Sequence, residues 1–135
     1  MKQAFIRAPI DTLHRLVRDR RGTTAVEFAL VAPALCLLIY GVMEFGRLAW
    51  TQSALNFAVE EAARCASVTP TVCGTSSQIA TYAASEIATG YVPASAFSGA
   101  TASCGHQVSA TFAYPFIATG LFSMTPTLTA TACFP

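Results

Sequence analysis

The chain has 135 residues, of which only 11% are charged and 53% are hydrophobic. An average soluble domain carries about 25% charged residues. Together with a mean hydropathy of +0.50, this composition excludes more than one small soluble domain and indicates a membrane segment beside it.

The first 22 residues form a basic leader. They hold six basic and two acidic side chains, for a net charge of +4, whereas residues 23–135 hold two basic and five acidic ones, for −3. Basic residues that precede an apolar segment stay on the cytoplasmic side of a membrane. We therefore expect a cytoplasmic leader and an exported C-terminal region. A nucleic-acid patch is disfavoured because the leader is short and adjoins the apolar segment. Residues 4–18 fit either an amphipathic helix on the inner leaflet or a loosely ordered tail.

An apolar segment, Ala25–Met43, follows the leader. As a helix it would be about 28 Å long, close to the ~30 Å of a bilayer core. It exceeds the apolar core of a cleaved secretory signal, and no small-x-small cleavage site follows it. The sequence therefore predicts a single transmembrane helix over residues 23–43. Pro33 lies inside it and is expected to bend the helix, which membrane helices tolerate.

Glu27 is the one ionisable side chain in that apolar segment. A carboxylate in hydrocarbon is costly unless it lies at the interface or is paired. Cutting the chain after Gly22 would create an amine on Thr23, about 6 Å or one helical turn from Glu27. The alternative needs no cut, because a carboxylate is also favoured at a helix N-terminus by the macrodipole.

The helical pattern continues beyond the span to about residue 64. Apolar and small residues recur there at spacings of three, four and seven, which is typical of an amphipathic helix leaving the bilayer. Polar side chains fill much of the rest: Glu44, Arg47, Gln52, Asn56, Glu60 and Arg64. Trp50 and Tyr40 suit an aromatic belt near the exit.

A second helix is predicted over residues 76–89, with Ser76 or Ser77 as its cap and Gly90 as its end. Two segments then alternate apolar and polar residues with β-branched enrichment, 107–114 and 127–134. This pattern predicts two antiparallel strands. The expected fold is α+β: a long N-terminal transmembrane helix extending out of the bilayer, a short second helix and a small antiparallel sheet.

Four of the five cysteines lie on the exported side, where an oxidising compartment favours disulfides. We favour Cys65–Cys73 and Cys104–Cys133, one of three possible pairings. The second pair requires the strand alternation to break near Gly105, since Cys104 and Cys133 otherwise differ in parity. Cys36 lies inside the span and is interpreted as a packing residue. A zinc site is disfavoured because no Cys-x-x-Cys pair occurs.

The segment Arg21-Gly22-Thr23-Thr24-Ala25-Val26-Glu27-Phe28-Ala29-Leu30-Val31-Ala32-Pro33 resembles the N-terminal signature of the TadE-like family. A second block, Gly41-Val42-Met43-Glu44-Phe45-Gly46-Arg47, resembles the stretch that follows the span in that family. These pilin-like proteins belong to the tight-adherence (Flp, type IVb) pilus assembly systems of bacteria. The two blocks cover residues 21–47, about a fifth of the chain.

The resemblance implies a pilin-like exported domain, residues 44–135, and a leader, residues 1–22, removed by a prepilin peptidase between Gly22 and Thr23. It implies that Glu27 pairs with the Thr23 amine of its own or a neighbouring subunit. The expected partners are the lipid bilayer, the peptidase, other pilin-like subunits and the inner-membrane assembly platform. Phe28 stands where major pilins usually carry tyrosine, which indicates a minor pilin or pseudopilin.

Three classes of function remain to be compared. The first is a bitopic inner-membrane pseudopilin; the second is an uncleaved, membrane-anchored binding module with an exported domain. An enzyme is disfavoured, because the exported part offers few acid–base groups and each exported cysteine is better used in a bridge. Those groups are Glu60, Glu61, Glu86 and His106. No catalytic residue, metal, cofactor, nucleic acid or small-molecule substrate is predicted.

Overall fold

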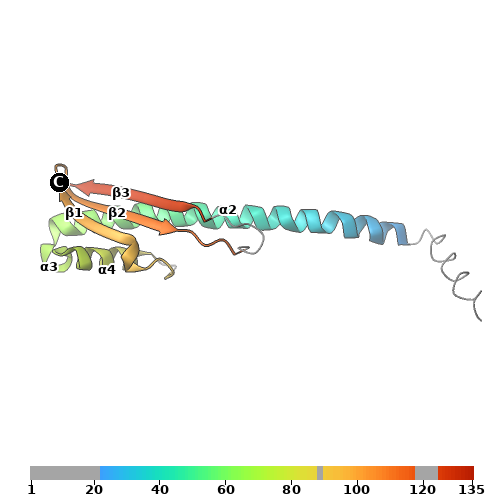
Figure 1. The fold of residues 1–135 in the computed structure, drawn as a ribbon, viewed down its shortest axis with the longest axis horizontal. Coiled ribbons are helices and arrows are strands. Elements are labelled where there is room, and N and C mark those ends of the chain that lie inside the picture. The colour runs from blue at the N-terminus through green and yellow to red at the C-terminus, as the bar shows by residue number, and fades with distance from the viewer. Residues whose placement is uncertain (1–21, 88–89, 118–124) are drawn as a thin grey trace, which may run out of the picture. The chain divides into compact units, whose positions relative to one another are not determined.

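The computed structural model describes residues 22–87, 90–117 and 125–135. The residues of the leader that precede Gly22, and the interpretations attached to them, lie outside this range. Contacts divide the chain into two units, Met1–Val42 and Met43–Pro135. The described elements are helices and an antiparallel sheet, which confirms the α+β fold (Figure 1).

The first described element is α2, Thr23–Val68, a helix of 46 residues. It continues through Pro33 without a break, as expected of a membrane helix. Its buried side chains all lie in the second unit, beginning at Glu44 and ending at Ala66. The helix ends one turn later than expected, since Pro70 forces the preceding Thr69 out of the helical region, to φ −130°.

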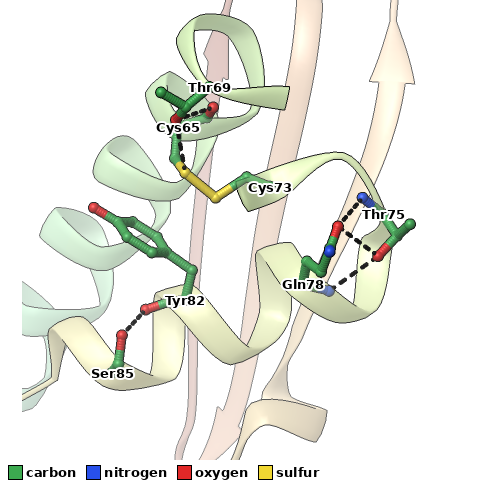
Figure 2. Close-up of a disulfide and its surroundings, with 7 residues drawn as sticks. All are labelled: Cys65, Thr69, Cys73, Thr75, Gln78, Tyr82 and Ser85. Atoms are coloured by element: carbon green, nitrogen blue, oxygen red, sulfur yellow. Dashed lines mark hydrogen bonds between the residues drawn. A yellow bond between two sulfur atoms is a disulfide. The ribbon is translucent and has the colours of Figure 1, made fainter. Parts of the chain in front are cut away.

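Two short helices follow: α3, Pro70–Cys73, and α4, Ser76–Glu86. The cap of α4 is Thr75, not Ser76 or Ser77 as the sequence suggested. Its hydroxyl accepts the Gln78 amide at 3.3 Å, and the Gln78 side chain accepts the Thr75 amide at 3.1 Å. This reciprocal capping box fixes the start of the helix (Figure 2). The helix ends at Glu86, earlier than the expected residue 89, because Ile87 is extended.

The sheet contains β1, Phe97–Ala102; β2, Gly105–Ala113; and β3, Thr127–Phe134, in that spatial order. A 3-10 turn, η2, Ala94–Ala96, precedes it. Both strand pairs are antiparallel. The two expected strands are β2 and β3, whereas β1 was missed. Gln52 and Ser67 of α2 donate to the carbonyls of Thr129 and Phe134 in β3, so the C-terminal half of α2 lies along the sheet (Figure 1).

The core of the second unit lies between α2, α4 and the sheet. Small residues on α2, including Ala58 and Ala62, are completely buried and let the backbones approach closely. Gly99 in β1 serves the same purpose, because a Cβ there would come within 2.7 Å of the Ile79 side chain on α4. Larger buried side chains of the cluster come from these elements and from the segment after β2, and they include Leu55, Val59, Ile79, Phe97, Val108, Tyr114 and Leu128.

Both cysteine pairs lie at disulfide distance. Cys65 near the end of α2 is bridged to Cys73 of α3, with 5.8 Å between the Cα atoms (Figure 2). Cys104 is bridged to Cys133, with 6.2 Å. The expected difference in parity between Cys104 and Cys133 does not prevent this bridge. Cys104 lies in the turn between β1 and β2, outside the alternation of the strands, and is followed by Gly105 at φ +120°. That left-handed residue breaks the alternation where the sequence required it.

Candidate functional site

The carboxylate of Glu44 is the centre of the best-formed polar site in the second unit. Glu44 lies on α2 immediately after the apolar segment and is only 5% exposed. The sequence pattern grouped it with the polar side chains of the amphipathic helix and did not predict its burial. It shares a face with Leu48, Thr51 and Leu55, at offsets of four, seven and eleven, and this is the face that packs on the core.

Three donors satisfy this carboxylate. Arg47 Nη1 donates to Oε2 at 3.1 Å, one turn along the same helix. The Tyr114 hydroxyl and the Ile117 amide donate to Oε1 at 3.4 and 3.3 Å. Glu44 thus fastens the segment that follows β2 to the start of the domain's helix. A buried carboxylate with several donors fixes geometry, because removing it would leave each donor unpaired.

Tyr114 is completely buried and forms the far side of this site. Burial raises the pKa of the Tyr114 phenol above its usual value, and the nearby Glu44 carboxylate raises it further, while Arg47 partly opposes them. Its ring packs edge-on against Phe116, with ring centroids 5.4 Å apart. The phenol therefore stays protonated at neutral pH and acts as a hydrogen-bond donor to Glu44.

A second contact attaches the segment after α4 to the same part of α2. The Thr51 hydroxyl donates to the Arg47 carbonyl at 2.8 Å and is hydrogen-bonded to the Tyr91 hydroxyl. The Tyr91 ring packs against Phe112 of β2, at 5.7 Å between centroids. Two segments from distant parts of the chain are therefore anchored within two turns of α2.

The residues predicted to act in processing lie in the first unit. Gly22 immediately precedes α2, is exposed, and has open space where a Cβ would be. Thr23 is the first residue of α2, and Glu27 follows four residues later, also exposed. Pro33 and Cys36 are exposed too, so Cys36 has no packing partner within the described chain. The structure thus places Thr23 and Glu27 one helical turn apart; cleavage and pairing stay predictions.

The residues considered for catalysis come from three elements. His106 lies in β2, while Glu60 and Glu61 lie on α2 and Glu86 ends α4. Over the ranges 22–87, 90–117 and 125–135, no group of three His, Cys, Asp or Glu side chains is arranged to hold a metal ion.

Helix α2 is long and apolar enough to cross a membrane, and none of its most apolar window is buried. The family model described as TadE-like protein matches residues 22–64. Over this segment the chain is similar to the TadE-like family. This match confirms the resemblance seen at residues 21–33 and 41–47. No curated protein and no solved structure shows significant similarity to the chain.

The TadE-like segment begins at Gly22 and covers all but the last turn of α2. It includes Glu44 and Arg47, but their partners Tyr114 and Ile117 lie outside it, as do both disulfides. The site therefore joins the TadE-like helix to the remainder of the domain. The block Glu44-Phe45-Gly46-Arg47 was the sequence signal for it, although the burial of Glu44 was not evident.

Proposed function

We propose that this protein is a bitopic inner-membrane minor pilin or pseudopilin that takes part in assembling a tight-adherence pilus or a related secretion filament. The TadE-like match over residues 22–64 carries this proposal. It is supported by a helix that is long and apolar enough to cross a membrane once, with a basic leader before it and a disulfide-linked domain after it.

The exposed surface of α2 supports a role in assembly. Between Thr23 and Val42 the side chains are almost all exposed and apolar. Such a helix needs lipid or other apolar helices around it. The bilayer satisfies this need before assembly, and neighbouring pilin-like subunits or the assembly platform satisfy it during assembly.

The proposal includes removal of the leader by a prepilin peptidase between Gly22 and Thr23. An exposed glycine directly before a helix suits a protease, which needs an accessible, unencumbered backbone. The new amine of Thr23 would then lie one turn from Glu27, the single carboxylate of the apolar segment. Pairing these charges lowers the cost of holding Glu27 in the membrane.

Deleting the gene in its host and restoring it on a plasmid tests the proposal. We expect the deletion to reduce the amount of pilus sheared from the cells and the wild-type plasmid to restore it. Membrane fractionation of the restored strain should place the protein in the inner membrane. Normal pilus yield in the deletion strain, with loss of adhesion to a surface or partner, would instead favour the anchored binding module.

A further inference from the structure

Large apolar side chains are exposed in the second unit exactly where α2 leaves the apolar segment. Phe45 is 75% exposed, Trp50 70% and Ile117 65%. Met43 and Tyr91 are also exposed and lie in the same region. We call these five residues the exit collar. Isolated exposed apolar residues need no explanation, but a cluster of aromatic ones does.

The members of the collar lie on different sides of α2. Phe45 and Trp50 are five residues apart, so they point about 140° away from each other around the helix. Ile117 and Tyr91 both lie on a third side, since their partners Glu44 and Thr51 are seven residues apart and share a face of the helix. The collar therefore has members on three sides of the helix.

The collar is also narrow along the helix. Its members on α2 run from Met43 to Trp50, about 10.5 Å along the axis, which is slightly more than the roughly 5–8 Å of one headgroup layer. At this level, Met43, Gly46, Arg47, Trp50, Thr51 and Tyr91 line an almost entirely apolar groove of about 370 Å³. Arg47 lies in it with its side chain 45% exposed, one guanidinium nitrogen bound to Glu44.

We infer that the exit collar is a membrane-contact surface, immersed in the headgroup layer of the leaflet that faces the folded domain. Its continuity with the apolar segment, which ends at Met43, identifies the occupant as lipid. A protein partner would cover one side of the helix, whereas lipid covers all sides at one depth. Aromatic side chains beside an arginine are typical of this layer, where rings meet the acyl boundary and the cation meets phosphates.

Glu44 gives this surface its shape. By binding the amide of Ile117, it brings a residue from after β2 to the depth of Phe45. The polar site and the collar thus depend on each other: the buried Glu44 carboxylate holds the segments of the domain so that their apolar side chains face lipid. This inference rests on the membrane-spanning part of the proposed function.

The chain has a single tryptophan, Trp50, which makes the inference directly measurable. The full chain is reconstituted into phosphatidylcholine–phosphatidylglycerol vesicles that contain lipids brominated at shallow or deep acyl positions. Flotation verifies insertion. We expect blue-shifted Trp50 emission, quenched at least twofold more by shallow than by deep bromines. Because the collar contacts whichever leaflet faces the domain, the insertion direction does not affect the result.

Two variants that move the probe provide matched comparisons. In Trp50→Phe/Phe57→Trp the tryptophan lies on the same helix about 10 Å further from the bilayer, where Phe57 is half exposed. We expect red-shifted emission without quenching. In Trp50→Phe/Ile117→Trp we expect shallow quenching like that of Trp50. Circular dichroism and intact disulfides verify that both variants are folded.

The outcomes separate the inference from the proposed function. Failure to float with vesicles would overturn the membrane anchor and the collar together. Insertion with an unquenched Trp50 would overturn the collar alone. Equal quenching at positions 50 and 57 would also overturn it, because the boundary would not lie at the collar. Quenching at 50 but not at 117 would exclude the segment after β2 from the contact surface.

Discussion

The Tyr114 hydroxyl donates a hydrogen bond of 3.4 Å to the Glu44 carboxylate across 70 positions of sequence. This bond connects the TadE-like helix to a part of the chain that the family match does not reach. Glu44 also accepts hydrogen bonds from the Arg47 guanidinium and the Ile117 amide. One carboxylate therefore sets the position of the segment after β2. The stability of the second unit should therefore depend strongly on this residue.

Glu44→Ala should lower the free energy of unfolding by about 2–3 kcal/mol, because the Tyr114 hydroxyl and Ile117 amide lose their acceptor. Tyr114→Phe should cost about 1 kcal/mol, since it removes one donor and keeps the ring. Urea unfolding of the detergent-solubilised chain, followed by circular dichroism, measures both. Glu60→Ala is the matched control, as Glu60 is exposed on the same helix; we expect a change below about 0.5 kcal/mol. Equal effects at positions 44 and 60 would contradict the role of Glu44.

Stability should decline at high pH partly through Tyr114. The folded protein raises the pKa of this phenol, so the unfolded chain loses the proton first. The contribution of the Tyr114 phenol to stability is fully present below pH ~10, which is the ordinary pKa of tyrosine. It is lost as the pH rises from there through the pKa of the phenol in the folded protein. The free energy of unfolding is measured from pH 8 to 11 in proteins that carry Cys36→Ser. It should decline more steeply with pH in the protein that keeps Tyr114 than in the one that carries Tyr114→Phe. Parallel curves would argue against the burial of the phenol.

The two disulfides should differ in their contribution to stability. Cys65–Cys73 closes 8 positions of chain and Cys104–Cys133 closes 29. On the chain-entropy model, replacing the first pair by alanine costs about 2.5 kcal/mol and the second about 3.6 kcal/mol. Comparing the two double variants by urea unfolding tests the order. Non-reducing peptide mapping tests the pairing itself, which four free exported thiols would reject.

Processing should depend on residue 22 and assembly on residue 27. Gly22→Trp should leave the full-length precursor, since a large side chain obstructs the peptidase site. Glu27→Ala should be cut normally but reduce filament yield, because the Thr23 amine loses its partner. Mass spectrometry of the N-terminus in the native host and the yield of sheared filaments measure these effects. An intact leader on the wild-type protein would refute processing and leave the membrane helix unaffected.

Gly105 should be the least replaceable glycine of the sheet. It has φ +120°, and a Cβ would come within 2.2 Å of the Phe134 carbonyl oxygen. Gly105→Ala should therefore destabilise the domain by about 1–3 kcal/mol. Gly46→Ala is a useful contrast, because nothing lies within 4 Å of its Cβ position and alanine favours helix. It should be neutral or stabilising by up to about 1 kcal/mol. Thermal unfolding of the two variants gives the comparison.

The sequence predicted the elements whose periodicity is strong. Helix α2 followed from an apolar segment continued by an amphipathic one, and β3 from alternating threonines and apolar residues. Strand β1 was missed because four of its six residues are glycine, alanine or serine, which have low β propensity, and they interrupt the pattern set by Phe97 and Thr101. That composition is required by packing against Ile79 on α4, a contact between positions 20 apart.

The candidate site was only half predictable. The block containing Glu44 and Arg47 was conspicuous in the sequence, and the i,i+3 spacing of the pair is a local property of a helix. The burial of Glu44 depends on Tyr114 and Ile117, whose approach follows from the sheet topology and not from any local pattern. The wrong cap of α4 had a local cause, since Thr75, Ser76 and Ser77 are all acceptable N-caps.

The placement of the two covalent bridges has a mechanical consequence. One closes the far end of α2 onto α3, and the other joins the turn between β1 and β2 to the last strand. A load carried along the helix towards the C-terminus therefore cannot draw out the chain enclosed by either bridge. Under tension the domain can lengthen only through the chain outside these two loops, chiefly the stretch from 74 to 103 that connects them.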